Sequence, residues 1–207
     1  MKFPTKKYFQ LAEFTNDYYK FFKTAFNSID IYNLKKIIRI LEKVYKSPNS
    51  KILICGNGGS AAIANHFACD HQKILFDTKK FKPFFVSLTC NSPLMTAISN
   101  DNDYGSIFSD QIKQIGKKND ILITISSSGN SKNVAKAIKV AKKMRLKTIS
   151  FTGFTGGSTK RLADYNIHVQ SFNYGIVESL HHTIMNIISQ FLKNKYLTKE
   201  KIRATYF

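Results

Sequence analysis

Short apolar runs, each followed by a polar or glycine-rich turn and then a helical pattern, recur along most of the chain. The apolar runs predict strands at 52–55, 84–88, 121–125, 148–152 and 167–169. Helical spacing of apolar residues predicts helices at about 60–73, 131–145, 158–163 and 176–195. Nearly all-apolar strands that alternate with helices form parallel sheets covered on both faces. The pattern therefore predicts a doubly wound α/β sandwich.

The first fifty residues follow a helical pattern without strands. Aromatic and apolar residues recur at helical spacing over 8–22 and again over 29–44. We interpret residues 1–48 as N-terminal helices that pack on the domain, and 49–207 as the α/β domain itself. With no linker between them, the two form one structural unit.

Composition narrows the class of protein. A chain of 207 residues, 43% hydrophobic and 13% aromatic, is long enough for one domain with a core and excludes disorder. The mean hydropathy is −0.22, and no apolar run approaches the roughly 18 residues that a spanning helix needs. The first residues contain no signal peptide pattern. Three cysteines without CxxC spacing give no disulfide framework or zinc knuckle and predict a reducing cytoplasm.

The net charge of +19 favours anionic partners: nucleic acid, an anionic membrane or phosphorylated metabolites. The lysines are spread over the chain without a block of like charges, and the densest basic stretch, 132–147, alternates with apolar residues at helical spacing. We interpret that stretch as a solvated helix face. Nucleic-acid binding has no recognition motif and is kept as a minor alternative.

Two loops carry the clearest chemical signals, and each joins a predicted strand to a predicted helix. The first, Gly56 to Ser60 (GNGGS), places backbone N–H groups at a helix N-terminus, which favours an anion. It is neither GxGxxG nor a Walker A loop, and a tight turn with Ser60 as N-cap is the alternative. The second, SSSGNS, gathers four hydroxyls: Ser126, Ser127, Ser128 and Ser131. Capping needs only one hydroxyl, so the surplus predicts a phosphate site.

Two predicted helices carry polar pairs on one face. His66 and Asp70 are four residues apart, a spacing that suits two metal ligands or a base with its partner. In the final helix, Glu178, His182 and Asn186 are spaced by four, and His181 follows Glu178 by three. Since Lys and Glu are absent from the rest of this helix until Lys193, a site is favoured over a solvent face.

Together these motifs resemble the SIS (sugar isomerase) domain family, and within it the phosphoheptose isomerases. The resemblance covers roughly residues 50–192. It depends on four blocks with family-like spacing: CGNGGSAAIANHFACD, AISNDNDYGSIF, ISSSGNSKNV and TGFTGG. It implies the doubly wound fold, a homotetramer with sites at subunit interfaces, and N-terminal helices that also pack on the oligomer. The implied reaction interconverts sedoheptulose 7-phosphate and D-glycero-D-manno-heptose 7-phosphate through an enediolate, for surface polysaccharides such as lipopolysaccharide.

The resemblance also implies roles for individual residues. Substrate contacts fall on Asn57, Gly58, Gly59, Asn100 and Asp101. The phosphate falls on Ser126, Ser127, Ser128 and Ser131, all of which are intact.

A zinc ion, one divalent metal per subunit, is implied by the same family. Its ligand positions correspond to His66, which is retained, and to Asp70, Glu178 and Asn186, which replace Glu, Gln and His. Glu178 also falls on a substrate-contact position. An isomerase needs a carboxylate base and an electrophile for the oxyanion, which zinc can supply. We expect Asp70 or Glu178 as base and His66 as ligand or donor. His181, which matches a family histidine, or His182 replaces the acid.

A second function remains open at this stage. Some relatives of phosphoheptose isomerases are adaptors of the replication initiator rather than enzymes. The altered residues of the final helix favour a non-catalytic SIS protein that binds a sugar phosphate or such a partner. The intact serine loop is compatible with both functions.

Overall fold

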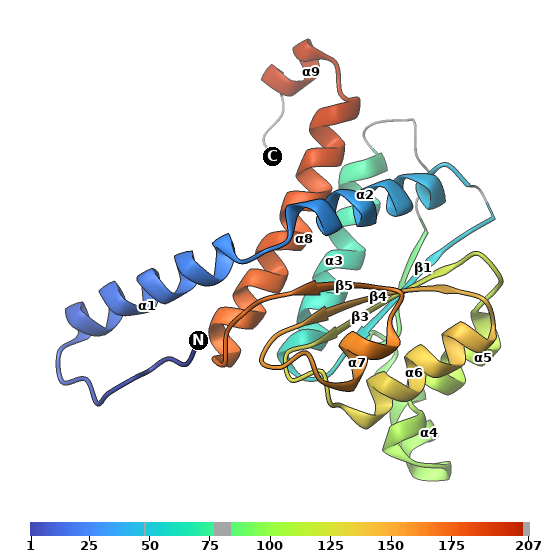
Figure 1. Cartoon of the computed structure of the whole chain (residues 1–207). Helices are drawn as coiled ribbons and strands as arrows, with labels where there is room; N and C mark the ends of the chain where they lie inside the picture. Colours follow the sequence, from blue (N-terminus) through green and yellow to red (C-terminus); the bar gives the residue numbers. More distant parts are fainter. Residues whose placement is uncertain (48, 77–83, 205–207) are drawn as a thin grey trace.

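A five-stranded parallel sheet lies at the centre of the chain (Figure 1). The computed structural model describes residues 1–47, 49–76 and 84–204. The strand order is β2-β1-β3-β4-β5. The strands are β1 (Ile52–Gly56), β2 (Phe85–Ser87), β3 (Ile121–Ser126), β4 (Lys147–Thr152) and β5 (Tyr165–His168). The five predicted strands are confirmed, with shifted ends.

Helices surround the sheet. They are α1 (Leu11–Asn27), α2 (Ile31–Tyr45), α3 (Gly59–Phe76), α4 (Ser92–Asp101), α5 (Ser109–Ile115), α6 (Lys132–Lys143), α7 (Gly157–Leu162), α8 (Tyr174–Tyr196) and α9 (Lys199–Ala204), with the 3₁₀ turn η1 (Tyr104–Ser106). The sequence pattern predicted α1, α2, α3, α6, α7 and α8 but missed α4, η1, α5 and α9. Helix α4 buries only Ile98, so it lacks an apolar stripe. Helices α5 and α9 are too short to show a period.

The sheet separates two hydrophobic cores, as a doubly wound fold requires. In β1, Ile52 and Ile54 face the core built with α2, α3 and α8, whereas Leu53 and Cys55 face the core built with α5 and α6. Figure 1 shows the two helix layers on opposite sides of the sheet. Because side chains alternate along a strand, a strand that is buried on both faces is apolar at most positions.

The N-terminal segment is attached to α8. The ring of Phe3 is 3% exposed and packs on the aromatic rings of α1, with 5.1 Å between the centroids of Phe3 and Phe14. The Asn173 side-chain amide, which also caps α8, donates to the Phe3 carbonyl at 3.0 Å. In the described residues, no helix combines the length and apolarity needed to cross a membrane.

Candidate active site

The strand order places a crevice between β1 and β3. The connection after β1 leads to α3 on one side of the sheet, and the connection after β3 leads to α6 on the other. Ligands of open parallel sheets bind at such a switch point, at the carboxyl ends of the strands. The GNGGS and SSSGNS loops both begin there.

A cavity of about 130 Å³ opens between these loops and α8; we call it the serine cavity. Its lining residues are Asn57, Ser60, Ile125, Ser126, Ser127, Ser128, Ser131, Tyr174 and Glu178. The structure therefore brings together the four predicted phosphate-binding serines, Asn57 and Glu178, which are up to 121 residues apart in the sequence.

The hydroxyls of the serine loop are not consumed by helix capping. Ser131 is the N-cap of α6, yet its side chain makes no capping bond. Ser126 Oγ lies 3.4 Å from Ser131 Oγ, and Ser128 Oγ accepts from Asn130 N–H at 3.3 Å. The Ser127 hydroxyl is buried and has no hydrogen-bond partner in the described structure. A buried hydroxyl without a partner is costly, and Ser127 belongs to the lining of the serine cavity, where a ligand could supply that partner.

Glu178 closes the cavity from α8 and lies against the start of α3. A Cβ on Gly59 would lie 2.5 Å from Glu178 Oε2, so any larger residue there would displace the carboxylate from this position. Burial raises the pKa of Glu178. A carboxylate with a raised pKa beside hydroxyl donors has the properties of a general base.

Helices α3 and α8 also bring together three further polar side chains, those of His66, Asp70 and His182. His66 Nδ1 forms a short hydrogen bond with His182 Nε2, and His66 Nε2 lies 3.1 Å from Asp70 Oδ2. Burial, and then the neighbouring His66, lower the pKa of His182. Of the two histidines considered as the acid, His182 is therefore the one that joins this cluster.

The predicted zinc ligands do not form a metal site as they are placed. Both ring nitrogens of His66 are engaged, with His182 and Asp70. Glu178 faces the serine cavity, which Asn186, two turns further along α8, does not line. Over residues 1–47, 49–76 and 84–204, no group of three or more His, Cys, Asp or Glu residues is arranged to hold a metal. We therefore derive no step through zinc.

His181 is placed in the core and not in the serine cavity. Its ring is fully buried and lies edge-on to Phe151, with 5.8 Å between the centroids. Burial lowers its pKa to about 4, so the ring is neutral at pH 7. His181 does not line the serine cavity, and its predicted catalytic role stays a prediction.

Asn100 and Asp101 are exposed at the end of α4, where the Asn100 amide donates to the Asp101 carboxylate at 3.0 Å. Neither residue lines the serine cavity or the larger cavity of about 520 Å³ beside it. That larger cavity is lined by Asn57, Asp103, Tyr104, Gly105, Ser131, Lys132, Asn133 and Lys136. The substrate contacts expected of Asn100 and Asp101 stay a prediction.

The sequence pattern does not single out several residues that line these cavities, among them Tyr104, Asn133 and Tyr174. Asn133 follows the serine loop by two residues, and that position in the first turn of α6 was a usable signal. Tyr104 is 47 residues from its partner Asn57, and no local pattern connects them.

Comparison with known proteins gives a consistent family. The SIS domain model matches residues 17–153. The probable phosphoheptose isomerase of Thermoplasma acidophilum is 39% identical over 167 residues, which cover 79% of this chain and 91% of that protein. The phosphoheptose isomerase of Clostridium acetobutylicum is 38% identical and covers 83% of this chain and 86% of that protein.

A solved structure supports the same family. The phosphoheptose isomerase GmhA of Neisseria gonorrhoeae superposes with a TM-score of 0.80 at 27% identity, covering 89% of this chain and all of that one (100%). Fold and site define a doubly wound α/β domain with a hydroxyl-lined cavity at its switch point. The chain belongs to the SIS domain family, among the phosphoheptose isomerases.

Proposed function

We propose that the protein is a phosphoheptose isomerase that converts sedoheptulose 7-phosphate to D-glycero-D-manno-heptose 7-phosphate. One observation of the site carries the proposal: Ser127, whose buried hydroxyl has no partner in the described structure, lines the same cavity as Glu178. A phosphate ligand and a proton acceptor are thereby available in one crevice. The relatives named above support the substrate.

The serine loop would hold the phosphate. Oxygen atoms of a phosphate accept hydrogen bonds, and the N-terminus of α6 adds a favourable field for an anion. The larger cavity shares Asn57 and Ser131 with the serine cavity. The larger cavity therefore adjoins the serine cavity at these two residues.

Glu178 is the better of the two predicted bases. The isomerisation moves a proton between adjacent carbons, so the base must reach the substrate. Glu178 lines the serine cavity, whereas Asp70 is bonded to His66 and lies outside that lining.

The adaptor alternative draws no support from the relatives, which carry the names of isomerases. Turnover of sedoheptulose 7-phosphate by the purified protein tests the proposal directly. Stoichiometric binding without turnover would contradict it and favour the non-catalytic protein.

Removing the Ser127 hydroxyl should weaken ligand binding without weakening the fold. The change Ser127→Ala removes a buried group that has no partner, so stability should stay equal or rise slightly. We expect the Kd for sedoheptulose 7-phosphate, measured by calorimetry, to rise about 10- to 150-fold, since a hydrogen bond to a charged group contributes about 1.5–3 kcal/mol.

Ser150→Ala is the matched control. Ser150 Oγ is likewise buried without a partner, but it lies in β4 outside the serine cavity. Its replacement should leave the Kd unchanged. Equal Kd values for the Ser127 variant and wild type would contradict a phosphate site at this loop.

Turnover should survive chelation. The donor groups of the described residues do not assemble a metal site. We therefore expect kcat to change by less than about 2-fold when a chelator is added, and again when zinc is added. The melting temperature should not rise with zinc. Loss of turnover on chelation, restored by zinc, would support the ligand set implied by the family instead.

The homotetrameric assembly and the cytoplasmic location of the protein stay predictions. Exposed apolar side chains on α1 and α8, among them Leu11 at 77% and Phe191 at 51% exposure, support burial in a homotetramer. The three cysteines are free, as expected for the cytoplasm. A role in lipopolysaccharide synthesis depends on the proposed substrate.

A further inference from the structure

The side chain of Asn57 is held by a network that none of the roles described so far explains. Its Nδ2 donates to Asn133 Oδ1 at 2.9 Å, and its Oδ1 accepts from Asn133 Nδ2 at 2.9 Å. Tyr104 Oη also donates to Asn57 Oδ1, at 3.1 Å. Asn57 lines both the serine cavity and the larger cavity, so its orientation affects any ligand that spans them.

A backbone group fixes which way the amides point. A reciprocal amide pair would keep both its hydrogen bonds if the oxygen and nitrogen of each side chain were exchanged. Here the Val134 backbone N–H donates to Asn133 Oδ1 at 2.9 Å. A backbone N–H can only donate, so this atom of Asn133 must be the oxygen. Asn57 must therefore present its nitrogen to Asn133 at that point.

The Asn57 side chain keeps one hydrogen-bond donor for a ligand. Its oxygen has two lone pairs and two donors, Asn133 Nδ2 and Tyr104 Oη. Its nitrogen has two hydrogens, one of which goes to Asn133 Oδ1. The second N–H has no partner among the described residues, and Asn57 belongs to the lining of both cavities.

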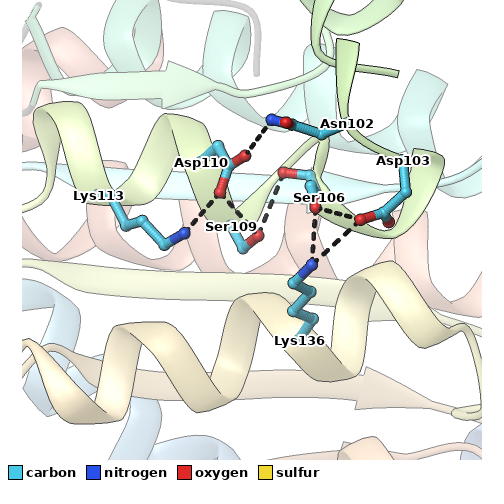
Figure 2. A network of polar contacts seen from close by, with 7 residues as sticks. All are labelled: Asn102, Asp103, Ser106, Ser109, Asp110, Lys113 and Lys136. Atoms are coloured by element: carbon cyan, nitrogen blue, oxygen red, sulfur yellow. Dashed lines mark hydrogen bonds and ion pairs between the residues drawn. The ribbon is translucent and has the colours of Figure 1, made fainter. Parts of the chain in front are cut away.

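The turn that carries Tyr104 is fastened to α6 by its own polar contacts (Figure 2). Lys136 Nζ donates to Ser106 Oγ at 2.6 Å and lies 3.4 Å from Asp103 Oδ2, while Ser106 Oγ donates to the same carboxylate oxygen at 2.6 Å. The Asp103 and Ser106 side chains flank Tyr104 on either side. One helix therefore positions both partners of Asn57: Asn133 directly, and Tyr104 through Lys136.

We propose that Asn133 and Tyr104 are positioning residues that make Asn57 present an N–H donor to an oxygen of the bound sugar phosphate. The inference deepens the proposed function and rests on it. The ligand atom must be an acceptor, such as a carbonyl, hydroxyl or phosphate oxygen, since a donor there would face another donor.

A double-mutant cycle on binding tests the proposal. Calorimetry with sedoheptulose 7-phosphate would compare wild type, Tyr104→Phe, Asn57→Ala and the double variant. We expect Tyr104→Phe to raise Kd about 2- to 10-fold, the range for one hydrogen bond. In the Asn57→Ala background the same change should have no effect, because Tyr104 acts through Asn57. Tyr19→Phe, on the exposed face of α1, is the control and should not change Kd.

The NMR signals of the ligand-free protein distinguish a loss of Asn57 positioning from a general loss of stability. The side-chain amide signals of Asn57, assigned by their loss in Asn57→Ala, should shift in the ligand-free spectrum of Tyr104→Phe, while the melting temperature stays that of wild type. An unchanged Kd in Tyr104→Phe, or an equal rise in Kd in both backgrounds, would overturn the proposal.

The outcomes also separate this inference from the proposed function. If wild type binds the sugar phosphate but does not isomerise it, the proposed function fails, and the cycle on Kd still decides the inference. If wild type does not bind the sugar phosphate at all, both are overturned.

Discussion

Replacing Glu178 with glutamine is expected to abolish turnover while leaving the protein at least as stable as wild type at neutral pH. The base of an isomerase contributes about 10²- to 10⁴-fold to the rate, and glutamine cannot accept the proton. Glutamine keeps the size of the side chain, so Gly59 and the serine cavity retain their shape. We therefore expect kcat to fall by at least about 10²-fold, with little change in Kd.

The stability half of this prediction follows from the direction of the pKa shift. Burial raises the pKa of Glu178, so the folded state binds this proton more tightly than the unfolded state. The ionised form of Glu178 therefore lowers the free energy of unfolding, and this loss develops as pH rises above the ordinary glutamate pKa. Glutamine does not ionise, so the variant does not have this loss at neutral pH. Chemical denaturation at pH 7 should give an equal or higher free energy of unfolding.

The same shift predicts the pH dependence of wild-type turnover. A base must be ionised, so activity should fall as pH drops through the raised pKa of Glu178, at a higher pH than an unperturbed glutamate would give. Asp70→Asn is the comparison, because Asp70 is the other predicted base. If Asp70→Asn abolished turnover and Glu178→Gln did not, Asp70 would be the base.

The parts of the site that the sequence could predict are those coded by local patterns. Strands β1 and β3 are buried at every position by two helix layers, so their apolar runs stand out against their polar neighbours. The SSSGNS loop is a contiguous motif at the end of such a strand, and parallel strands end at one edge. These two facts are enough to bring the loops of β1 and β3 together.

Side chains on helices were harder to place, because neighbouring positions differ by about 100° around the axis. His181 and His182 illustrate this. Four-residue spacing from Glu178 selects His182, which does contact His66, whereas the family correspondence selected His181, which faces the buried Phe151. The periodicity was the better guide to orientation.

Contacts between segments that are far apart in the sequence could not be predicted, because no local sequence pattern indicates them. The Tyr104–Asn57 bond spans 47 residues and depends on η1, a short turn without periodicity. The prediction of a zinc site likewise used only the residue types at positions that correspond to the family's ligands. Zinc binding depends also on the directions in which ring nitrogens and carboxylates point. Only the folded chain shows that His66 has both nitrogens engaged.

Gly59→Ala is expected to lower turnover about 10²-fold, since a displacement of a catalytic group by about 1 Å can have an effect of that size. The new Cβ would lie 2.5 Å from Glu178 Oε2 and 2.9 Å from Oε1, well inside contact distance. A carboxylate is the mobile end of a flexible side chain, so it should move aside and the fold should survive. Steady-state kinetics and a thermal melt measure the two effects separately.

Gly58→Ala serves as the contrast to Gly59→Ala. A Cβ at Gly58 would meet no atom within 4 Å, but its φ of +53° is strained for alanine. This variant should therefore lose stability, by about 1–2 kcal/mol, without displacing Glu178.

The decisive comparison combines Gly59→Ala with Glu178→Gln. If alanine acts by displacing the base, it should add no further loss of turnover once the base is gone, and the two effects should be strongly non-additive. The Glu178→Asp change, which shortens the side chain by one methylene, should restore part of the turnover of Gly59→Ala by relieving the clash. Full additivity would mean that Gly59 acts on the substrate through its own backbone, as the family resemblance implies, and not through the room it leaves for Glu178.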